Sequence, residues 1–196
     1  MRTRDINKEE IVKRKAIEML VSQGVEGFGM NRLARECSVS VATLYIYYSD
    51  KEDLIKKIGT EIGQNFFNEM LDGFSSEMSF VDGLRKQWEN RSRFVINNLL
   101  ETTCFELLKH STYADAILSK ITPDFRNEME KFITKSIEKK ELLPMTFEIF
   151  WSIAYGSLYS LLELHREGKS MSGKPFVFTD EIRDEAFDMV LKALIP

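Results

Sequence analysis

The chain has 196 residues, of which 43% are hydrophobic and 30% charged, and it carries a net charge of −4. This composition excludes an intrinsically disordered chain and is typical of a folded globular protein. No apolar run reaches the roughly 18 residues that cross a bilayer, and the first residues are charged, so we expect neither a membrane segment nor a signal peptide. The cysteines Cys37 and Cys104 lie far apart in the sequence, which favours the reducing cytoplasm over a disulfide framework.

The first part of the chain predicts three helices. The first runs from about Asn7 to Gly24, where the glycine ends it. The second spans about 30–37 and has one apolar face. A three-residue turn follows, and Ser40 caps a third helix that reaches Tyr48.

The rest of the chain predicts six more helices, because helical periodicity resumes after each capping or first-turn residue. Ser49 with Glu52 and Ser79 with Asp82 both match the capping box. The six helices begin near Ser49, Ser79, Thr102, Thr122, Pro144 and Thr179. Strand signals are nearly absent. The predicted fold class is therefore all-α, with an N-terminal three-helix domain over 1–50 and a C-terminal helical bundle over 51–196, about nine helices in total.

Two short helices joined by a three-residue turn indicate a helix-turn-helix. The specific segment runs from Ser40 to Leu54 and reads SVATLYIYYSDKEDL. This segment resembles the TetR/AcrR family of one-component bacterial transcriptional regulators. Ser38 and Ala42 depart from the family pattern, since glycine is usual in the turn and frequent in the recognition helix. Neither change threatens the fold, because serine bonds locally in turns and alanine favours helix.

The third predicted helix carries hydroxyls and aromatic rings but no charge. Hydroxyls, lysine and helix N-termini commonly bind DNA phosphates, whereas small apolar side chains contact thymine methyl groups and asparagine can pair with adenine. The alternative for the tyrosines is packing in the domain core, which we expect for Tyr48. The resemblance implies phosphate contacts by Thr43, Tyr45, Tyr47 and Lys51, with Ser40 at the helix N-terminus, and it places Asn31, Val41 and Ala42 nearest the bases.

No catalytic constellation is present, and we expect no enzyme. His110 and His165 stand alone, and Cys104 has no paired ligand, so the sequence predicts no metal site. Nucleophile elbows, phosphate loops and dinucleotide fingerprints are absent, so no cofactor is expected.

The resemblance implies a pocket for a small-molecule effector inside the C-terminal bundle. Arg91 and Glu101 indicate opposite effector charges, and the sequence leaves that choice open. Ordinary core packing also explains most of the large side chains in this region. The candidate pocket residues are Trp88, Arg91, Phe125, Trp151 and Tyr155.

The last two helices are predicted to form a homodimer. Small residues such as Gly156 and Ser160 permit close helix approach, and the resemblance implies a four-helix interface. Two copies of the N-terminal domain are needed to reach palindromic half-sites about 34–36 Å apart. The leading hypothesis is a repressor released from its operator when an effector changes that spacing. The alternative is a TetR-like DNA-binding protein that is controlled by a protein partner or acts without a small-molecule ligand.

Overall fold

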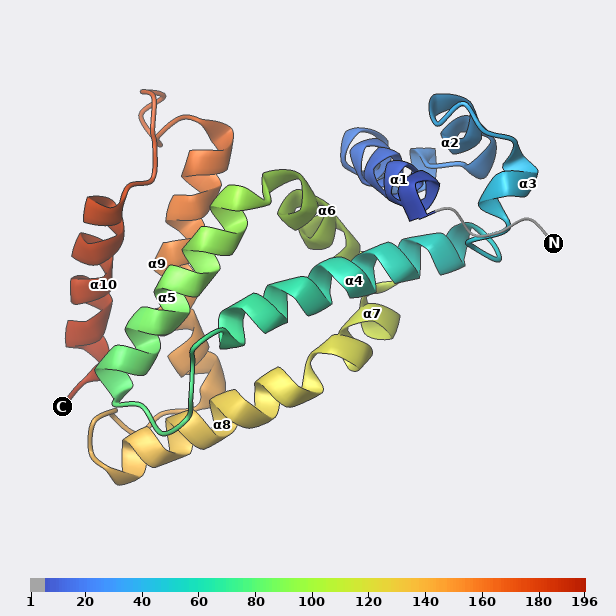
Figure 1. Cartoon of the computed structure of the whole chain (residues 1–196). Helices are drawn as coiled ribbons and strands as arrows, with labels where there is room; N and C mark the ends of the chain where they lie inside the picture. The colour runs from blue at the N-terminus through green and yellow to red at the C-terminus, as the bar shows by residue number, and fades with distance from the viewer. Residues whose placement is uncertain (1–5) are drawn as a thin grey trace. The chain divides into compact units, whose positions relative to one another are not determined.

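The computed structural model describes the chain from Ile6 onward, with the side chains of Ile6 and Asn7 outside the description. In this part of the chain every regular element is a helix, which confirms the all-α prediction (Figure 1). From Ile6 onward the chain forms ten helices, where about nine were predicted. Their bounds are α1 (Ile6–Gly27), α2 (Met30–Glu36), α3 (Val41–Leu44), α4 (Lys51–Leu71), α5 (Phe80–Asn97), α6 (Leu99–Lys109), α7 (Ala114–Ile121), α8 (Pro123–Glu138), α9 (Phe147–Glu167) and α10 (Asp180–Leu194).

The chain divides into two compact units. Unit 1 holds the chain up to Asn65 together with 98–122, and unit 2 holds 66–97 together with 123–196. Helix α4 therefore supplies residues to both units. The division by packing thus differs from the predicted division at residue 50, which concerned function and stays a prediction.

Unit 1 is built around α1, which packs against both α2 and α6. The regular part of α1 ends at Gly24, whose φ of 71° and ψ of 176° interrupt the helix, as the sequence indicated. Val12, Ala16 and Leu20 are buried at helical spacing along α1. This face is the core of unit 1.

Two glycines on α4 allow a close approach inside unit 1. A Cβ added at Gly63 would lie 2.7 Å from Phe105 Cε2 and closer still to Ile121 Cδ1. A Cβ added at Gly59 would lie 3.1 Å from Leu108 Cδ1. Because ordinary carbon contacts lie at about 3.5–4.0 Å, only glycine lets α6 and α7 pack this tightly on α4.

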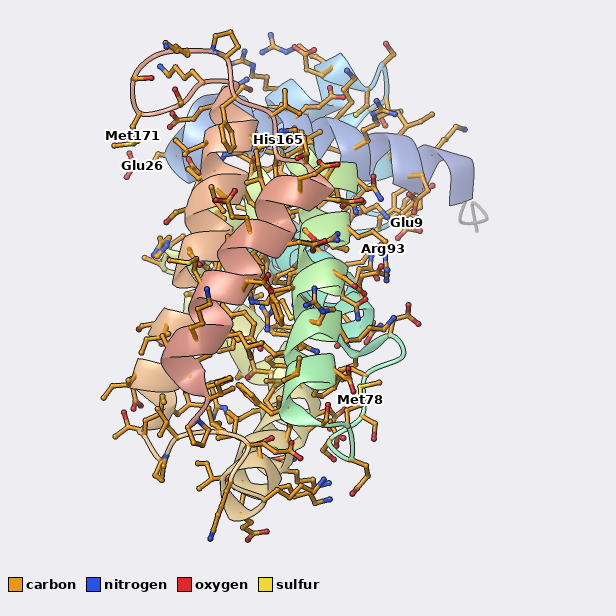
Figure 2. The ribbon with its side chains drawn as sticks, turned by 90° about the vertical axis from the view of Figure 1, so that its left-hand side faces the viewer. Glu9, Glu26, Met78, Arg93, His165 and Met171 are labelled. Carbon is orange, nitrogen blue, oxygen red and sulfur yellow. The ribbon has the colours of Figure 1, made fainter. Side chains whose placement is uncertain are left out.

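Unit 2 is organised around α9, which packs against α5 and α10, and the three helices lie side by side in Figure 1. Phe80, Leu84, Phe150 and Leu158 are fully buried in the core of unit 2. The loop between α9 and α10 carries Met171 away from this core, as Figure 2 shows.

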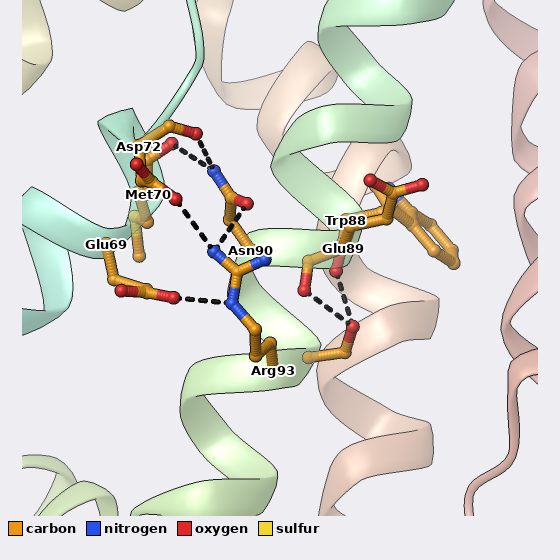
Figure 3. A network of polar contacts seen from close by, with 8 residues as sticks. Glu69, Met70, Asp72, Trp88, Glu89, Asn90 and Arg93 are labelled. Carbon is orange, nitrogen blue, oxygen red and sulfur yellow. Dashed lines mark hydrogen bonds and ion pairs between the residues drawn. The ribbon is translucent and has the colours of Figure 1, made fainter.

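A polar network joins the end of α4 to α5 within unit 2 (Figure 3). The Asn90 side-chain amide donates to the carbonyls of Met70, at 3.2 Å, and Asp72, at 2.8 Å. Arg93 donates from Nε to Glu69 at 2.6 Å and also reaches Asp72. Side chains of α5 therefore satisfy carbonyls that the end of α4 leaves open.

The predicted caps of α3, α5 and α10 are confirmed. Ser40 accepts from the Thr43 amide, and Thr179 accepts from Ile182. Asp82 N donates to Ser79 Oγ, which in turn donates to Asp82 Oδ2.

Other predicted boundaries were wrong by a few residues. Helix α4 is capped by Asp50, which accepts from Asp53 N at 2.7 Å, rather than by Ser49 with Glu52. Aspartate is at least as good an N-cap as serine, so the neighbouring residue takes the role. Helix α9 begins after Thr146 instead of at Pro144.

Helix α7 was not predicted, because it has only 8 residues and its N-cap, Tyr113, makes no side-chain cap hydrogen bond. Its signal was the pair Ile117 and Ile121, both buried and four residues apart. Among the described residues, no helix is long and apolar enough to cross a membrane.

Candidate functional site

The turn between α2 and α3 is held by backbone bonds to the end of α2. Ser38 N donates to Arg35 O at 3.0 Å, and Val39 N donates to Ala34 O at 2.9 Å. Ser38 adopts a left-handed conformation with a φ of 54°. A residue other than glycine costs about 1 kcal/mol or more in this region. The departure from glycine at this position therefore leaves the turn intact but strained.

Helix α3 is a single α-helical turn. Ser40 Oγ accepts from Thr43 N at 3.2 Å and lies 2.8 Å from Thr43 Oγ1. Beyond Leu44 the chain continues as tighter turns, with Ile46 N donating to Thr43 O and Tyr47 N to Leu44 O. The predicted helix end at Tyr48 was therefore wrong, because α3 ends at Leu44 and i to i+3 bonds follow it, with one α-helical bond from Tyr48 N to Leu44 O.

These tighter turns decide which side chains are accessible. Tyr45 is 52% exposed, and Asn31 and Ala42 are also exposed. Tyr47 is only 6% exposed, and its ring centroid lies 6.4 Å from that of Tyr48, which is buried as expected. Packing in unit 1 thus dominates the surroundings of Tyr47, and its predicted phosphate contact stays a prediction. The remaining candidates, Ser40, Val41 and Thr43, are exposed or half-buried.

Lys51 is already engaged within unit 1. Its Nζ donates to Val25 O at 2.9 Å and lies 6.0 Å from the centre of the Phe28 ring. A carbonyl left open near the end of α1 is thereby satisfied by a cation. A phosphate contact by Lys51 requires that this ammonium share or leave the Val25 carbonyl.

Two cations beside the candidate interface were not singled out from the sequence. Arg32 and Arg35 are exposed on α2, three residues apart and therefore on one face. Arg32 follows Asn31 directly and Arg35 lies three residues further on, so the signal was available in the sequence.

Residues 7–58, which include this helix-turn-helix, match the sequence model of the bacterial regulatory proteins of the tetR family. The matched segment is therefore a tetR-type helix-turn-helix. A curated relative, an uncharacterized HTH-type transcriptional regulator from Haemophilus influenzae, is 24% identical over 80 residues. That match covers 41% of this chain and 43% of the relative, so the chain spans less than half of that relative's length.

Solved TetR-family structures resemble the whole chain. A TetR family transcription regulator from Marinobacter aquaeolei VT8 has a TM-score of 0.81 at 24% identity, covering 99% of this chain and 98% of its own. A tetR-family bacterial regulatory protein from Rhodococcus RHA1 has a TM-score of 0.75 at 16% identity, covering 96% and 97%. These likenesses show the fold. The family is one of regulators rather than enzymes, in agreement with the prediction of no enzyme.

Four of the five candidate effector residues lie together in unit 2, centred on Arg91. Its guanidinium carbon lies 4.0 Å from the ring centre of Tyr155, 4.9 Å from that of Trp151 and 5.6 Å from that of Phe125. Arg91 is completely buried. The arrangement is a cation between aromatic faces, which attract it electrostatically.

The fifth candidate, Trp88, packs elsewhere in unit 2. Its Nε1 donates to Ala154 O at 2.7 Å, and its ring meets Phe187 edge to face at 5.5 Å. Trp88 is thus a fully satisfied core residue beside α9 and α10.

Two partners of Arg91 were absent from the candidate set. Tyr159 is hydrogen-bonded to Nη1 of Arg91, and Gln87 Oε1 accepts from Nη2 at 3.2 Å. Tyr159 stands four residues after Tyr155, and Gln87 four before Arg91, so helical spacing carried the signal. Glu101, the acidic alternative, is half-buried in unit 1.

Proposed function

We propose that this TetR-family regulator represses transcription as a homodimer on a palindromic operator and is released by a small-molecule effector bound in unit 2. The observation that carries the DNA-binding part is the matched helix-turn-helix, whose α3 is capped by Ser40. Ala42 on α3 and Tyr45 directly after it are exposed to solvent. Small and hydroxyl-bearing side chains on a short helix suit the major groove.

In this proposal the contacts to DNA are divided by chemistry. The exposed side chains of Asn31 and Ala42, together with the half-buried Val41, read base edges. The phosphate contacts come from the remaining candidates and from the two arginines of α2. These are Ser40, Thr43, Tyr45, Tyr47, Lys51, Arg32 and Arg35.

The dimer is proposed to form through α9 and α10. Gly156, Ser157 and Ser160 are exposed along α9, and Met189 on α10 is 65% exposed. A Cβ added at Gly156 meets no atom within 4 Å. Small residues beside an exposed apolar side chain favour close packing of a second copy on this face.

The proposed effector site is the aromatic cluster around Arg91. Burying a charge without an opposite charge destabilises a fold, so core packing alone does not account for this cluster. An effector releases the operator only if it binds one of the two conformations of the dimer more tightly than the other.

Selection of bound duplexes from a random DNA pool tests the proposal directly. The expected product is a palindrome whose half-site centres lie about one helical turn apart. Enrichment of a single half-site, or no enrichment, would contradict the dimeric operator.

The role of Tyr45 is tested by measuring the affinity of Tyr45→Phe for the selected operator and for an unrelated duplex. A lost hydrogen bond to a phosphate should weaken both about tenfold, because phosphate contacts carry no sequence information. Tyr113→Phe is the matched control. Tyr113 is the half-buried N-cap residue of α7, and its substitution should leave both affinities unchanged. A loss confined to the operator would refute a phosphate contact.

The salt dependence of operator binding should be shallow. Helix α3 has no charge, and the Lys51 ammonium is already hydrogen-bonded to Val25 O. Arg32 and Arg35 are then the main cations with which each copy neutralises phosphates, and the slope of log affinity against log salt counts those few contacts. A slope near −10, as for about ten phosphate contacts, would contradict this expectation.

Gly156→Trp tests the dimer face by sedimentation. The added ring has open space within one chain, so the variant should fold with unchanged helicity but sediment as a monomer. The control Thr134→Trp places the same ring at an exposed position of α8, and this variant should remain a dimer. A dimeric Gly156→Trp would remove this face from the proposal.

A further inference from the structure

Arg91 is a buried positive charge that meets no carboxylate. Its side chain is fully buried, and among the described residues no aspartate or glutamate forms an ion pair with it. Arg93, two residues later on the same helix, is exposed and paired with Glu69 and Asp72. Because arginine stays protonated inside proteins, the charge of Arg91 cannot be removed by losing a proton.

The groups that do surround Arg91 are neutral. Aromatic faces of Tyr155, Trp151 and Phe125 attract the guanidinium, and Gln87 and Tyr159 provide oxygen atoms. Cation–π contacts and neutral hydrogen bonds lessen the cost of burial but leave a full positive charge. A compensating anion is therefore the missing component.

Two polar atoms in this cluster are buried without a hydrogen-bond partner. They are the Nε of Arg91 and the hydroxyl of Tyr155. Buried donors are nearly always satisfied in folded proteins, so each such exception calls for a physical explanation. The two atoms belong to side chains in direct contact, and a carboxylate has two oxygens with which to accept from both.

Tyr155 cannot itself supply the missing negative charge. Burial raises the pKa of its hydroxyl to about 12, although the neighbouring Arg91 charge opposes that shift. The hydroxyl therefore stays protonated near neutral pH and acts as a donor.

We propose that Arg91 and Tyr155 bind the carboxylate of a small monoanion whose apolar body lies against Trp151 and Phe125. This inference rests on the proposed function, because the monoanion would be the effector. Arg91 is the only cation of the cluster, which matches a single negative charge and disfavours polyanions such as phosphate esters. The aromatic faces offer apolar contact area and few further donors.

The cluster reaches the surface through α9. Trp151 and Tyr159 are only half-buried, and the exposed Phe147 ring lies 5.7 Å from that of Trp151. Movement of these side chains gives a ligand access to Arg91, and the Tyr159 hydroxyl is the group that a carboxylate oxygen would displace.

Isothermal titration calorimetry of the full chain tests the site with three pairs of probes: benzoate and benzamide, 4-phenylbutanoate and 4-phenylbutanamide, and hexanoate and hexanamide. Each pair differs in charge but hardly in shape. At least one carboxylate is expected to bind ten times or more as tightly as its amide. Equal affinity within all three pairs, or no binding of any carboxylate at 10 mM (roughly the weakest range in which a specific site is useful), overturns the inference.

Arg91→Met should abolish the preference for the carboxylate, because methionine fills similar space without charge. Arg93→Met is the matched control and should keep the preference. Tyr155→Phe removes one donor and should weaken carboxylate binding several-fold while sparing the amide, which keeps the test valid if Arg91→Met fails to fold. A preference that survives both Arg91→Met and Tyr155→Phe would refute the site.

The same carboxylate is then added to the complex with the selected operator. If the carboxylate binds through Arg91 but the operator stays bound, the site stands and the proposed release by an effector is wrong. If the operator is bound but no carboxylate is preferred over its amide, the inference falls and the DNA-binding function stands.

Discussion

Gly83 on α5 is the position where a single methyl group should do most harm in unit 2. A Cβ there would lie 2.6 Å from Phe132 Cζ, closer still to Phe132 Cε2, and 3.3 Å from Phe74 Cε2. Phe132 is fully buried, with the Phe74 ring at 5.1 Å and the Phe80 ring at 5.9 Å. The Phe132 ring therefore needs to retreat by about 1 Å to reach ordinary contact distance, and other rings block its retreat.

Gly83→Ala should destabilise the protein by about 2 kcal/mol. Overpacking of a tight core costs up to about 3 kcal/mol. Alanine returns about 1 kcal/mol through its higher helix propensity. In a chain of this length the net change corresponds to a fall in Tm of roughly 4–8 °C.

Urea denaturation of a double-mutant cycle with Phe132→Leu identifies the cause. If the clash is with the Phe132 ring, leucine should relieve it, and the two changes should be coupled by at least about 1 kcal/mol. A stabilised Gly83→Ala, or additive effects in the cycle, would refute the reasoning.

Three further outcomes follow from local contacts. Ser79→Ala should lower the free energy of unfolding by about 1 kcal/mol in urea denaturation, because the amide at the third helical position loses its cap; no change would show that water replaces the hydroxyl. Asp53→Asn should cost about 0.5 kcal/mol at pH 7, because the pKa of Asp53 is lowered mainly by its hydrogen bond with Lys57. Because the pKa of Asp53 is lower in the folded protein, its carboxylate stabilises the fold fully above the unfolded pKa near 4, and this contribution disappears as the pH falls through the folded pKa. The Tm values of this variant and the parent should therefore converge towards about pH 2, and a Tm difference that grows in acid would contradict the reasoning. In thiol titration of the folded protein at pH 8, Cys37 should react well before Cys104, whose pKa burial raises to about 12, and equal rates would contradict the burial of Cys104.

Two predicted caps, Ser40 and Thr179, act as predicted. Ser40 directly precedes the apolar start of α3, whereas Asp180 adjoins Thr179 and was also eligible. Where several eligible residues adjoin, as at Ser49-Asp50, pattern alone does not choose between them. The structure selects Asp50 because its carboxylate reaches Asp53 N.

The surroundings of the candidate site residues could not be predicted, because sequence periodicity does not show how side chains pack in the fold. Spacing put Tyr47 on the same face as Thr43, but the chain leaves α-helical geometry after Leu44 and Tyr47 turns into unit 1. Conversely, the residues grouped around Arg91 come from three helices far apart in the sequence. Aromatic composition suggested them, while only the fold shows which rings face the cation.

Unit 1 is assembled from two separate stretches of the chain, and this affects how it can fold during synthesis on the ribosome. The face of α1 and the glycines at 59 and 63 are covered by α6 and α7, which lie in 98–122. The helix-turn-helix emerges first, yet its compact unit is complete only when residue 122 has been synthesised. At roughly 5–20 residues per second, the nascent head keeps apolar surface uncovered for several seconds. A fragment cut after residue 65 would keep that surface permanently, so a soluble miniature of the head needs the 98–122 segment joined to it.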